Sequence, residues 1–377
     1  MKKLLIMASL FWPQRNGGGP PVSIMNLVMS IKDQFDISII SNNHEIGDDK
    51  PLPGIAQGWN TFPFGKAWYV PKRQHTFQNI TMLIESVQPD VIYQNSFFSY
   101  NDLLPVLAYK KRHRQVKVIV APRGEFYPER FRCGRLKKAL YCKMLKTSGL
   151  LNDIYFQGTG QEECDQEARL LGIPAERLLN IQNLSVVSGV GEEMVEKVPG
   201  RLKLVYIARV HPTKNTLNAI RWLAQLDGQV TYDIYGPIED QRYWQECCEA
   251  IESLPQNIRV NYMGMADHDK VGEIICGYHA YYMPTFGENY GHSIVESMLV
   301  GRPVVISDQT PWSDVDGTGG YSCPVGEAER FVSALNKLCS MDQPDYSALC
   351  AGAKRYIAEK LNTGQIIKDY IKAFDGE

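Results

Sequence analysis

The segment AYYMPTFGENYGHSIVESMLVGRPVVISD, residues 280–308, predicts the local architecture on which the whole chain is built. Its first part, Tyr281–Phe286, is apolar and aromatic like a buried strand, and Gly287 follows where the chain must turn. Ser293–Leu299 repeats apolar residues at helical spacing, and a second strand-like run, Arg302–Asp308, comes next. Strand, helix and strand in this order predict two parallel strands joined by a helix.

The same alternation of short apolar runs and amphipathic segments continues along nearly the whole chain. In the first half, the predicted strands are 3–9, 36–41, 90–96, 117–123, 153–158 and 177–183, and the predicted helices include 22–33, 77–87 and 134–148. In the second half, the predicted strands are 202–209, 230–236, 258–264, 280–286 and 302–308, and helices are expected at 216–226, 293–299, 346–361 and 363–374. This alternation predicts parallel sheets with helices on both faces.

The length of 377 residues is more than one hydrophobic core usually serves, so two domains are expected. The polar, acidic and glycine-bearing segment 186–201 interrupts the alternation and reads as a linker. We expect an N-terminal Rossmann-like domain over 1–190, a C-terminal Rossmann-like domain over 200–360 and a helix over 361–377, whose return to the first domain is left open. Two doubly wound domains of this kind face a central cleft, with ligands at the carboxyl ends of the strands.

Composition narrows the class of protein. A content of 44% apolar and 22% charged residues is ordinary for a globular protein, and a net charge of −2 provides no general attraction to nucleic acid. Nine scattered cysteines without a C-x-x-C pair argue against a disulfide framework and a zinc site, and fit a reducing cytoplasm.

The start, MKKLLIMASLFW, is either a signal peptide or a buried first strand, and its short apolar run favours the strand. No apolar stretch has the roughly 18 residues of a membrane span.

Three glycines, Gly17, Gly18 and Gly19, follow the first predicted strand. Backbone amides at such a turn can approach an anion, and the next helix adds its positive N-terminus. A nicotinamide site would need the spacing G-x-G-x-x-G, which Pro20 and Pro21 interrupt, so we reject that reading.

Two cations, Arg209 and Lys214, flank a turn that leads into the predicted helix 216–226. Cations at this end of a helix oppose its dipole, and an anion bound between them would remove the conflict. A diphosphate suits both side chains, since arginine offers a fork and lysine a point charge. Two solvated surface cations are the alternative.

Two acids, Glu288 and Glu296, stand eight residues apart in the opening segment. Glu288 lies in the predicted turn, and Glu296 lies on the early helix, off its apolar stripe. Each has a structural alternative: Ser293 and Glu296 match a capping box, and a helix N-terminus favours a carboxylate such as Glu288. Both acids and the two cations fall at strand ends of one domain, which favours a binding site.

These motifs resemble those of a known family. FGENYGHSIVESMLVGRPVVISDQTPW, residues 286–312, resembles the E-x7-E signature of the retaining family 4 glycosyltransferases of the GT-B fold. ARVHPTKN, residues 208–215, resembles their diphosphate motif, and NGGGPP, residues 16–21, resembles their N-domain glycine loop. The likeness is dense in the C-terminal half and looser in the N-terminal half, where APRGEFYP also contributes.

The resemblance implies a retaining transfer of a sugar from a nucleotide-diphosphate donor, bound by the C-terminal domain, to an acceptor hydroxyl, bound by the N-terminal domain. It implies that Glu288 contacts hydroxyls of the sugar, that Glu296 contacts the ribose, and that Arg209 and Lys214 hold the departing diphosphate. The other donor contacts that it implies are Gly18, Gly19, Asn289, Tyr290, Gly291 and His292, with backbone amides of 289–291 toward the phosphates. It implies no metal cofactor and a front-face transfer, so Glu288 is not assigned as a nucleophile.

One departure concerns the segment IVAPRGEF, which holds Arg123 and Glu125 where many members of the family carry a histidine after the fourth N-domain strand. We place Arg123 among the catalytic candidates. Asp314 and Asp316 form a D-x-D pair in a loop, for which metal binding is disfavoured. His211 is expected to order its turn; the remaining histidines show no ligand spacing and are His44, His75, His113, His268 and His279.

Residues 110–146 carry 13 Lys and Arg residues against Glu125 and Glu129, with apolar residues between the cations. This segment is either a solvated basic helix or a site of attachment to anionic lipid. A lipid-linked saccharide acceptor would make attachment useful, on the inner face of the plasma membrane.

The pathway that the resemblance favours is bacterial surface polysaccharide synthesis, of O-antigen, capsule or exopolysaccharide. A sugar-nucleotide epimerase or hydrolase on the same fold is the alternative enzyme. A non-catalytic sugar-nucleotide or glycan-binding module is the alternative outside catalysis.

Overall fold

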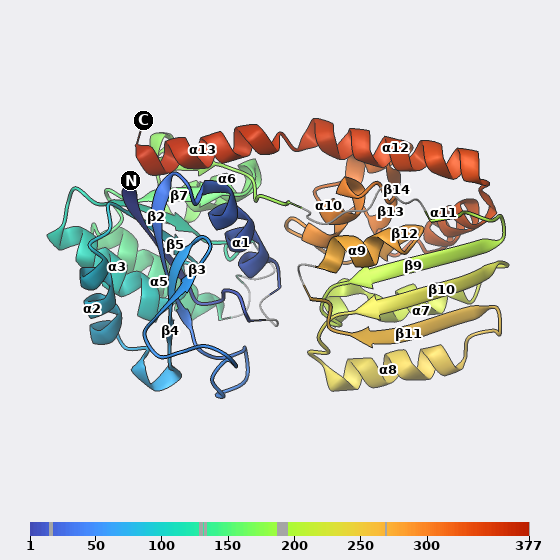
Figure 1. Cartoon of the computed structure of the whole chain (residues 1–377), viewed down its shortest axis with the longest axis horizontal. Coiled ribbons are helices and arrows are strands. Elements are labelled where there is room, and N and C mark those ends of the chain that lie inside the picture. Colours follow the sequence, from blue (N-terminus) through green and yellow to red (C-terminus); the bar gives the residue numbers. More distant parts are fainter. Residues whose placement is uncertain (15–17, 128–130, 132–133, 187–194, 268–269, 377) are drawn as a thin grey trace. The chain divides into compact units, whose positions relative to one another are not determined.

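The computed structural model describes residues 1–14, 18–127, 131, 134–186, 195–267 and 270–376. The chain forms two compact units, Met1–Leu184 with Thr363–Glu377, and Ser185–Asn362. Each unit is a largely parallel sheet with packed helices, as the sequence predicted (Figure 1). Half of the predicted linker 186–201, residues 187–194, lies outside the described residues.

The first unit contains an eight-stranded sheet of order β3-β4-β2-β1-β5-β6-β7-β8. Its strands are β1 (Lys2–Ala8), β2 (Phe35–Asn42), β3 (Trp59–Phe62), β4 (Gly65–Val70), β5 (Val91–Asn95), β6 (Lys117–Ala121), β7 (Tyr155–Gly158) and β8 (Leu178–Asn180). All six strands that were predicted here are confirmed. The β3–β4 pair was not predicted; it is antiparallel, while every other pair in the sheet is parallel. It takes the place of a crossover helix between β2 and β4.

Most helices of this unit bury an apolar face, whereas α6 also buries Glu163 and Glu167. They are α1 (Gly19–Ile31), α2 (Phe77–Val87), α3 (Tyr100–Arg112), α5 (Arg135–Thr147), α6 (Gln161–Leu171) and α13 (Thr363–Asp375), with the 3-10 turns η1 (Lys72–Gln74) and η2 (Ala175–Arg177). In α2, for example, Ile80, Ile84 and Val87 face the core at helical spacing. The last helix, α13, packs on this unit, where the ring of Phe374 lies 5.8 Å from Phe35 and 5.4 Å from Tyr93.

The second unit contains a six-stranded, all-parallel sheet of order β11-β10-β9-β12-β13-β14. Its strands are β9 (Arg201–Ile207), β10 (Gln229–Tyr235), β11 (Ile258–Gly264), β12 (Ala280–Met283), β13 (Val304–Ser307) and β14 (Gly320–Cys323). Its helices are α7 (Thr216–Leu223), α8 (Gln241–Glu252), α9 (Val271–Cys276), α10 (His292–Leu299), α11 (Ala328–Ser340) and α12 (Gln343–Lys360), with η3 (Pro212–Lys214) and η5 (Ser313–Val315). The five predicted strands are confirmed, and β14, only four residues long, was missed.

The strand order of the second sheet indicates where a ligand would be expected. Numbered along the unit, the order is that of a doubly wound sheet, and the direction of winding reverses between β9 and β12. In such sheets ligands bind at the carboxyl ends of the strands beside this reversal. The segments that follow β9 and β12 therefore occupy the expected ligand-binding position.

Two further observations concern the chain as a whole. The eight cysteines among the described residues are free thiols. None of the described helices is long and apolar enough to cross a membrane.

Candidate functional site

The turn after β9 is ordered by local hydrogen bonds. His211 caps η3: its Nδ1 accepts from the backbone N–H of Thr213 at 3.3 Å and lies 2.9 Å from the Thr213 hydroxyl. Asn215 ends the turn with φ 59°, the left-handed region that an asparagine tolerates. The turn therefore presents Lys214 in a fixed direction.

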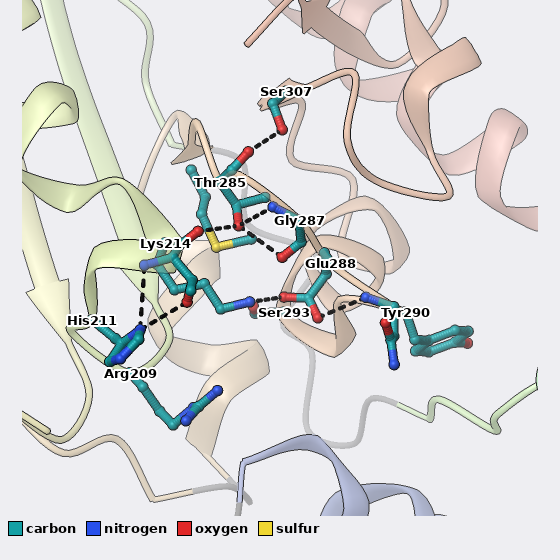
Figure 2. A network of polar contacts seen from close by, with 12 residues as sticks. Arg209, His211, Lys214, Thr285, Gly287, Glu288, Tyr290, Ser293 and Ser307 are labelled. Carbon is teal, nitrogen blue, oxygen red and sulfur yellow. Dashed lines mark hydrogen bonds and ion pairs between the residues drawn. The ribbon is translucent and has the colours of Figure 1, made fainter. Parts of the chain in front are cut away.

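The turn after β12 is bonded directly to the turn after β9 (Figure 2). The carbonyl of Thr213 accepts from the backbone N–H of Phe286 at 2.9 Å and from the Thr285 hydroxyl at 3.1 Å. The Asn215 amide donates to the carbonyl of Pro284 at 2.9 Å. The two loops beside the reversal of strand order are thus one preorganised unit.

Lys214 and Glu288 form an ion pair across these loops (Figure 2). Their side chains are 10% and 20% exposed, so Lys214 is not a solvated surface cation. Arg209 pairs instead with Glu239, with distances of 2.7 and 2.9 Å from its Nη1 to the two carboxylate oxygens. Both predicted diphosphate ligands therefore hold a carboxylate, the chemistry of the anion expected there. Glu239 was missed, although it follows β10, the neighbour of β9.

The backbone around Glu288 leads to an uncapped helix. The Glu288 carboxylate accepts from the N–H of Asn289 at 3.1 Å, so this amide is already engaged. Gly291, with φ 74°, is the N-cap of α10, and no side chain among the described residues caps that terminus. The first N–H groups of a helix carry a partial positive charge and suit an anion.

Two more residues that were predicted to contact the nucleotide-sugar donor flank the N-terminus of α10. Tyr290 is buried, its carbonyl accepts from the Trp312 indole, and its ring lies 4.7 Å from that of His292. His292 is the first residue of α10, and its Nδ1 lies 2.8 Å from the hydroxyl of Ser185. The second unit thus brings together the residues from Arg209 to Glu296 that the sequence singled out.

Glu296 differs from its prediction. It was expected off the buried stripe of the helix, but it is only 4% exposed. The capping-box alternative is also wrong, because α10 begins at His292 and the Ser293 hydroxyl lies 2.8 Å from the Tyr281 hydroxyl. The carboxyl group of Glu296 has no hydrogen-bond partner in the described part of the chain, and burial raises its pKa to about 7. Burying a carboxyl group without a partner costs folding stability. Groups with a pKa shifted in this way are common at functional sites.

The remaining candidates belong to the first unit. Gly18, with φ 66°, is the N-cap of α1, and Gly19 is the first residue of that helix, while Gly17 lies outside the described residues. Arg123 has φ 57°, an unusual value for arginine. Its guanidinium donates to the Asn95 amide oxygen at 2.9 Å and to the Tyr93 hydroxyl at 3.0 Å.

Neighbouring contacts hold the strained backbone at Arg123. The N–H of Gly124 donates to Glu163 of α6. Glu125 accepts from the N–H of Phe97, beyond β5, at 2.6 Å. Strain that the surroundings fix in this way is typical of functional sites.

One member of the D-x-D pair is engaged elsewhere: Asp314 accepts from Tyr356 and pairs with Lys360, both on α12. Over the described ranges, no three His, Cys, Asp or Glu side chains gather in a way that could hold a metal ion. His268 lies outside those ranges.

Comparisons with known proteins agree with this geometry. Residues 201–341, from β9 to just beyond α11, match the family model described as glycosyl transferases group 1. A comparison with curated proteins finds no matching sequence.

Several solved structures share the fold over the full chain. HepE of Anabaena, in complex with UDP and glucose, has a TM-score of 0.72 and 16% identity, covering 100% of both chains. Sucrose-phosphate synthase of Thermosynechococcus elongatus has a TM-score of 0.72 and 13% identity, again covering 100% of both chains. The lipopolysaccharide outer core galactosyltransferase WaaB, in its apo form, has a TM-score of 0.62 and 16% identity, covering 100% of this chain and 99% of the other. The fold is therefore that of the GT-B glycosyltransferases.

Proposed function

We propose that the protein is a retaining glycosyltransferase that moves a sugar from a nucleotide-diphosphate donor to an acceptor hydroxyl. The observation that carries this proposal is the buried carboxyl of Glu296, without a hydrogen-bond partner among the described residues, on the helix that follows the Lys214–Glu288 turn at the reversal of strand order. A ribose diol offers the two donors that such a carboxyl lacks. The match of the same residues to group 1 glycosyltransferases supports this assignment.

Each residue then has a role in the departure of the diphosphate. Negative charge grows on the leaving group in the transition state, and fixed cations and helix N-terminal amides stabilise it there. Lys214, Arg209 and the start of α10 provide these groups, while Glu288 contacts hydroxyls of the sugar. The leaving phosphate takes the proton of the acceptor on the same face, and no metal ion takes part.

We further propose that the acceptor is a growing surface glycan, such as O-antigen, capsule or exopolysaccharide, assembled from the cytoplasm. The resemblance in fold to a lipopolysaccharide galactosyltransferase supports this choice, and free thiols fit a reducing compartment. An epimerase or hydrolase on the same fold would consume the donor without an acceptor, whereas a transferase needs one for full turnover.

Thermal unfolding with UDP-, GDP-, ADP- and TDP-sugars in EDTA tests the donor site. We expect one nucleotide to raise the unfolding temperature, because a ligand at 100 times its dissociation constant adds roughly 2.7 kcal/mol to stability. Glu296→Ala should remove most of that shift, since the ribose loses its partner. Absence of a shift with every nucleotide would contradict the proposal.

The helix α5 supports a contact with anionic membrane. It carries five cations and no acid, and three residues four apart, Leu136, Leu140 and Met144, are 86%, 69% and 49% exposed. Its opposite face, with Tyr141 and Leu145, is buried in the first unit. An exposed apolar stripe between cations is typical of helices that lie in a lipid headgroup layer. Arg130, Arg132 and Glu129 of the basic segment lie outside the described residues.

Sedimentation with vesicles of anionic phosphatidylglycerol tests this contact. The double variant L136S/L140S should bind about tenfold or more weakly, because two leucine side chains no longer enter the lipid. Raising the salt concentration should weaken wild-type binding through the cations. The matched control is Met82→Ser, which removes a 55% exposed apolar side chain from α2. Equal binding of the double variant and this control would refute the contact.

A further inference from the structure

A cavity of about 280 Å³, lined by several polar side chains, lies within the first unit. Its walls come from the segments that follow β1, β2, β4 and β5, so it opens at the carboxyl ends of these parallel strands. The winding of this sheet reverses between β1 and β5, where Ser9 and Ser99 line the cavity. The cavity therefore occupies the position at which doubly wound sheets bind ligands.

A buried carboxylate orients one histidine of this cavity. Asp102, on the first turn of α3, is 2% exposed and accepts from His75 Nε2 at 2.7 Å and from the Ser9 hydroxyl at 2.7 Å. The Ser99 hydroxyl donates to it as well. Burial alone would raise the pKa of Asp102, but the hydrogen bonds from His75, Ser99 and Ser9 outweigh burial and lower the pKa. An ionised Asp102 keeps the proton of His75 on Nε2.

The other ring nitrogen of His75 is then available to a ligand. No described residue makes a hydrogen bond to Nδ1, and the side chain, 12% exposed, lines the cavity. In neutral imidazole with its proton on Nε2, Nδ1 is a hydrogen-bond acceptor. The same arrangement of carboxylate and imidazole presents an acceptor nitrogen to a hydroxyl group in many enzymes.

The rest of the wall matches the chemistry of a sugar. Asn42 and Asn101 provide amides, and Tyr100, 42% exposed, provides an aromatic ring. Amides both donate and accept, as sugar hydroxyls require, and an aromatic ring packs on the apolar face of a pyranose. Lys72, the lysine of the cavity, is paired with Asp49, which weakens the case for an anion site.

We propose that this cavity binds the saccharide acceptor through one of its hydroxyl groups, which donates to His75 Nδ1, and that Asp102 positions His75. The inference rests on the proposed transfer to a hydroxyl and assigns that acceptor a place. Tyr100 packs edge-on against Tyr141 of α5, with ring centroids 4.6 Å apart. The cavity thus adjoins the helix assigned to the membrane, as a lipid-linked saccharide requires.

Saturation-transfer NMR with methyl glycosides of glucose, galactose, mannose and N-acetylglucosamine, each on the order of 10 mM, tests the cavity. Wild-type protein should transfer saturation to at least one glycoside. His75→Leu and, independently, Tyr100→Leu should each reduce that signal at least fivefold. Tyr100→Leu keeps the test valid if loss of His75 unfolds the protein.

The control is His113→Leu, because His113 is also a histidine beside a carboxylate, Glu85, but at the opposite end of α3. It should leave the glycoside signal unchanged. No signal from wild type, or equal signals from wild type and both cavity variants, would overturn the proposal. Displacement of the glycoside by inorganic phosphate would overturn it in favour of an anion site.

Asp102→Asn separates positioning from a structural role. Nitrogen chemical shifts of the His75 ring should show the Nε2–H tautomer in wild type and a mixture in the variant, with a weaker glycoside signal. An unchanged tautomer would remove Asp102 from the proposal. The rise in unfolding temperature with nucleotide sugars is measured on the same samples. Its absence in wild type refutes the transferase assignment, whereas the glycoside signal alone decides whether the cavity binds the acceptor.

Discussion

Lys214→Met is expected to lower turnover of the nucleotide sugar by about 10²–10³-fold, the usual effect of removing one preorganised group from a developing negative charge. Lys214 is held for this role by the turn after β9, and its side chain is only 10% exposed, so solvent does not screen it strongly. The measurement is nucleotide release from the donor that thermal unfolding identifies. The loss should fall mainly on kcat, because the charge is largest in the transition state.

Controls separate this role from the stability of the ion pair. Lys203→Met makes the same substitution on β9, at the end away from the site, and should retain full turnover. Lys214→Met also leaves Glu288 without its cation. If the pair only stabilised the fold, the double variant with Glu288→Gln would recover activity, since neither charge is left alone. We expect the double variant to stay inactive, and its recovery would refute the catalytic role.

The sequence predicted much of this site because the relevant signals are local. Apolar runs predicted eleven of the strands. Because a parallel sheet brings the carboxyl ends of its strands to one edge, Arg209, Lys214 and Glu288, which follow such ends, could be predicted to lie at one site. What the sequence missed depends on register or on distant contacts. Glu296 was predicted to lie off the apolar stripe of its helix. The structure buries every residue of α10 from Ile294 to Met298, so all faces of the helix are covered there and Glu296 is buried with its neighbours.

Contacts between residues far apart in the sequence could not be predicted from sequence patterns. His75 showed no ligand spacing, because its partner Asp102 lies 27 residues away and meets it only when η1 and α3 fold beside β1. The β3–β4 pair was missed for a related reason. Its strands, WNTF and GKAWYV, are short, and Pro63 and Phe64 between them are not a common two-residue hairpin turn.

Glu296→Gln is expected to make the protein more stable than wild type at high pH, and progressively less so as the pH falls. Burial raises the pKa of Glu296 to about 7, above its ordinary value of 4.5. The folded protein therefore keeps this proton while the unfolded chain has lost it, and wild type loses stability as the pH rises from about 4.5 to 7. One pKa unit corresponds to 1.36 kcal/mol, so the advantage of the variant should grow by about 2 kcal/mol between pH 5 and pH 8.

Denaturant unfolding of both proteins across this pH range measures the difference, with Glu359→Gln, an exposed glutamate of α12, as the matched control. A difference between Glu296→Gln and wild type that does not change with pH would show that the carboxyl is already satisfied in the folded protein.

Nucleotide binding should move the pKa of Glu296 in the opposite direction to burial. Ribose hydroxyls that donate to Glu296 favour its ionised form, so binding should release a proton near pH 6, which calorimetry in two buffers detects. The stability lost by keeping an acid here is then recovered on binding, and Glu296→Gln should be the more stable protein but the weaker binder.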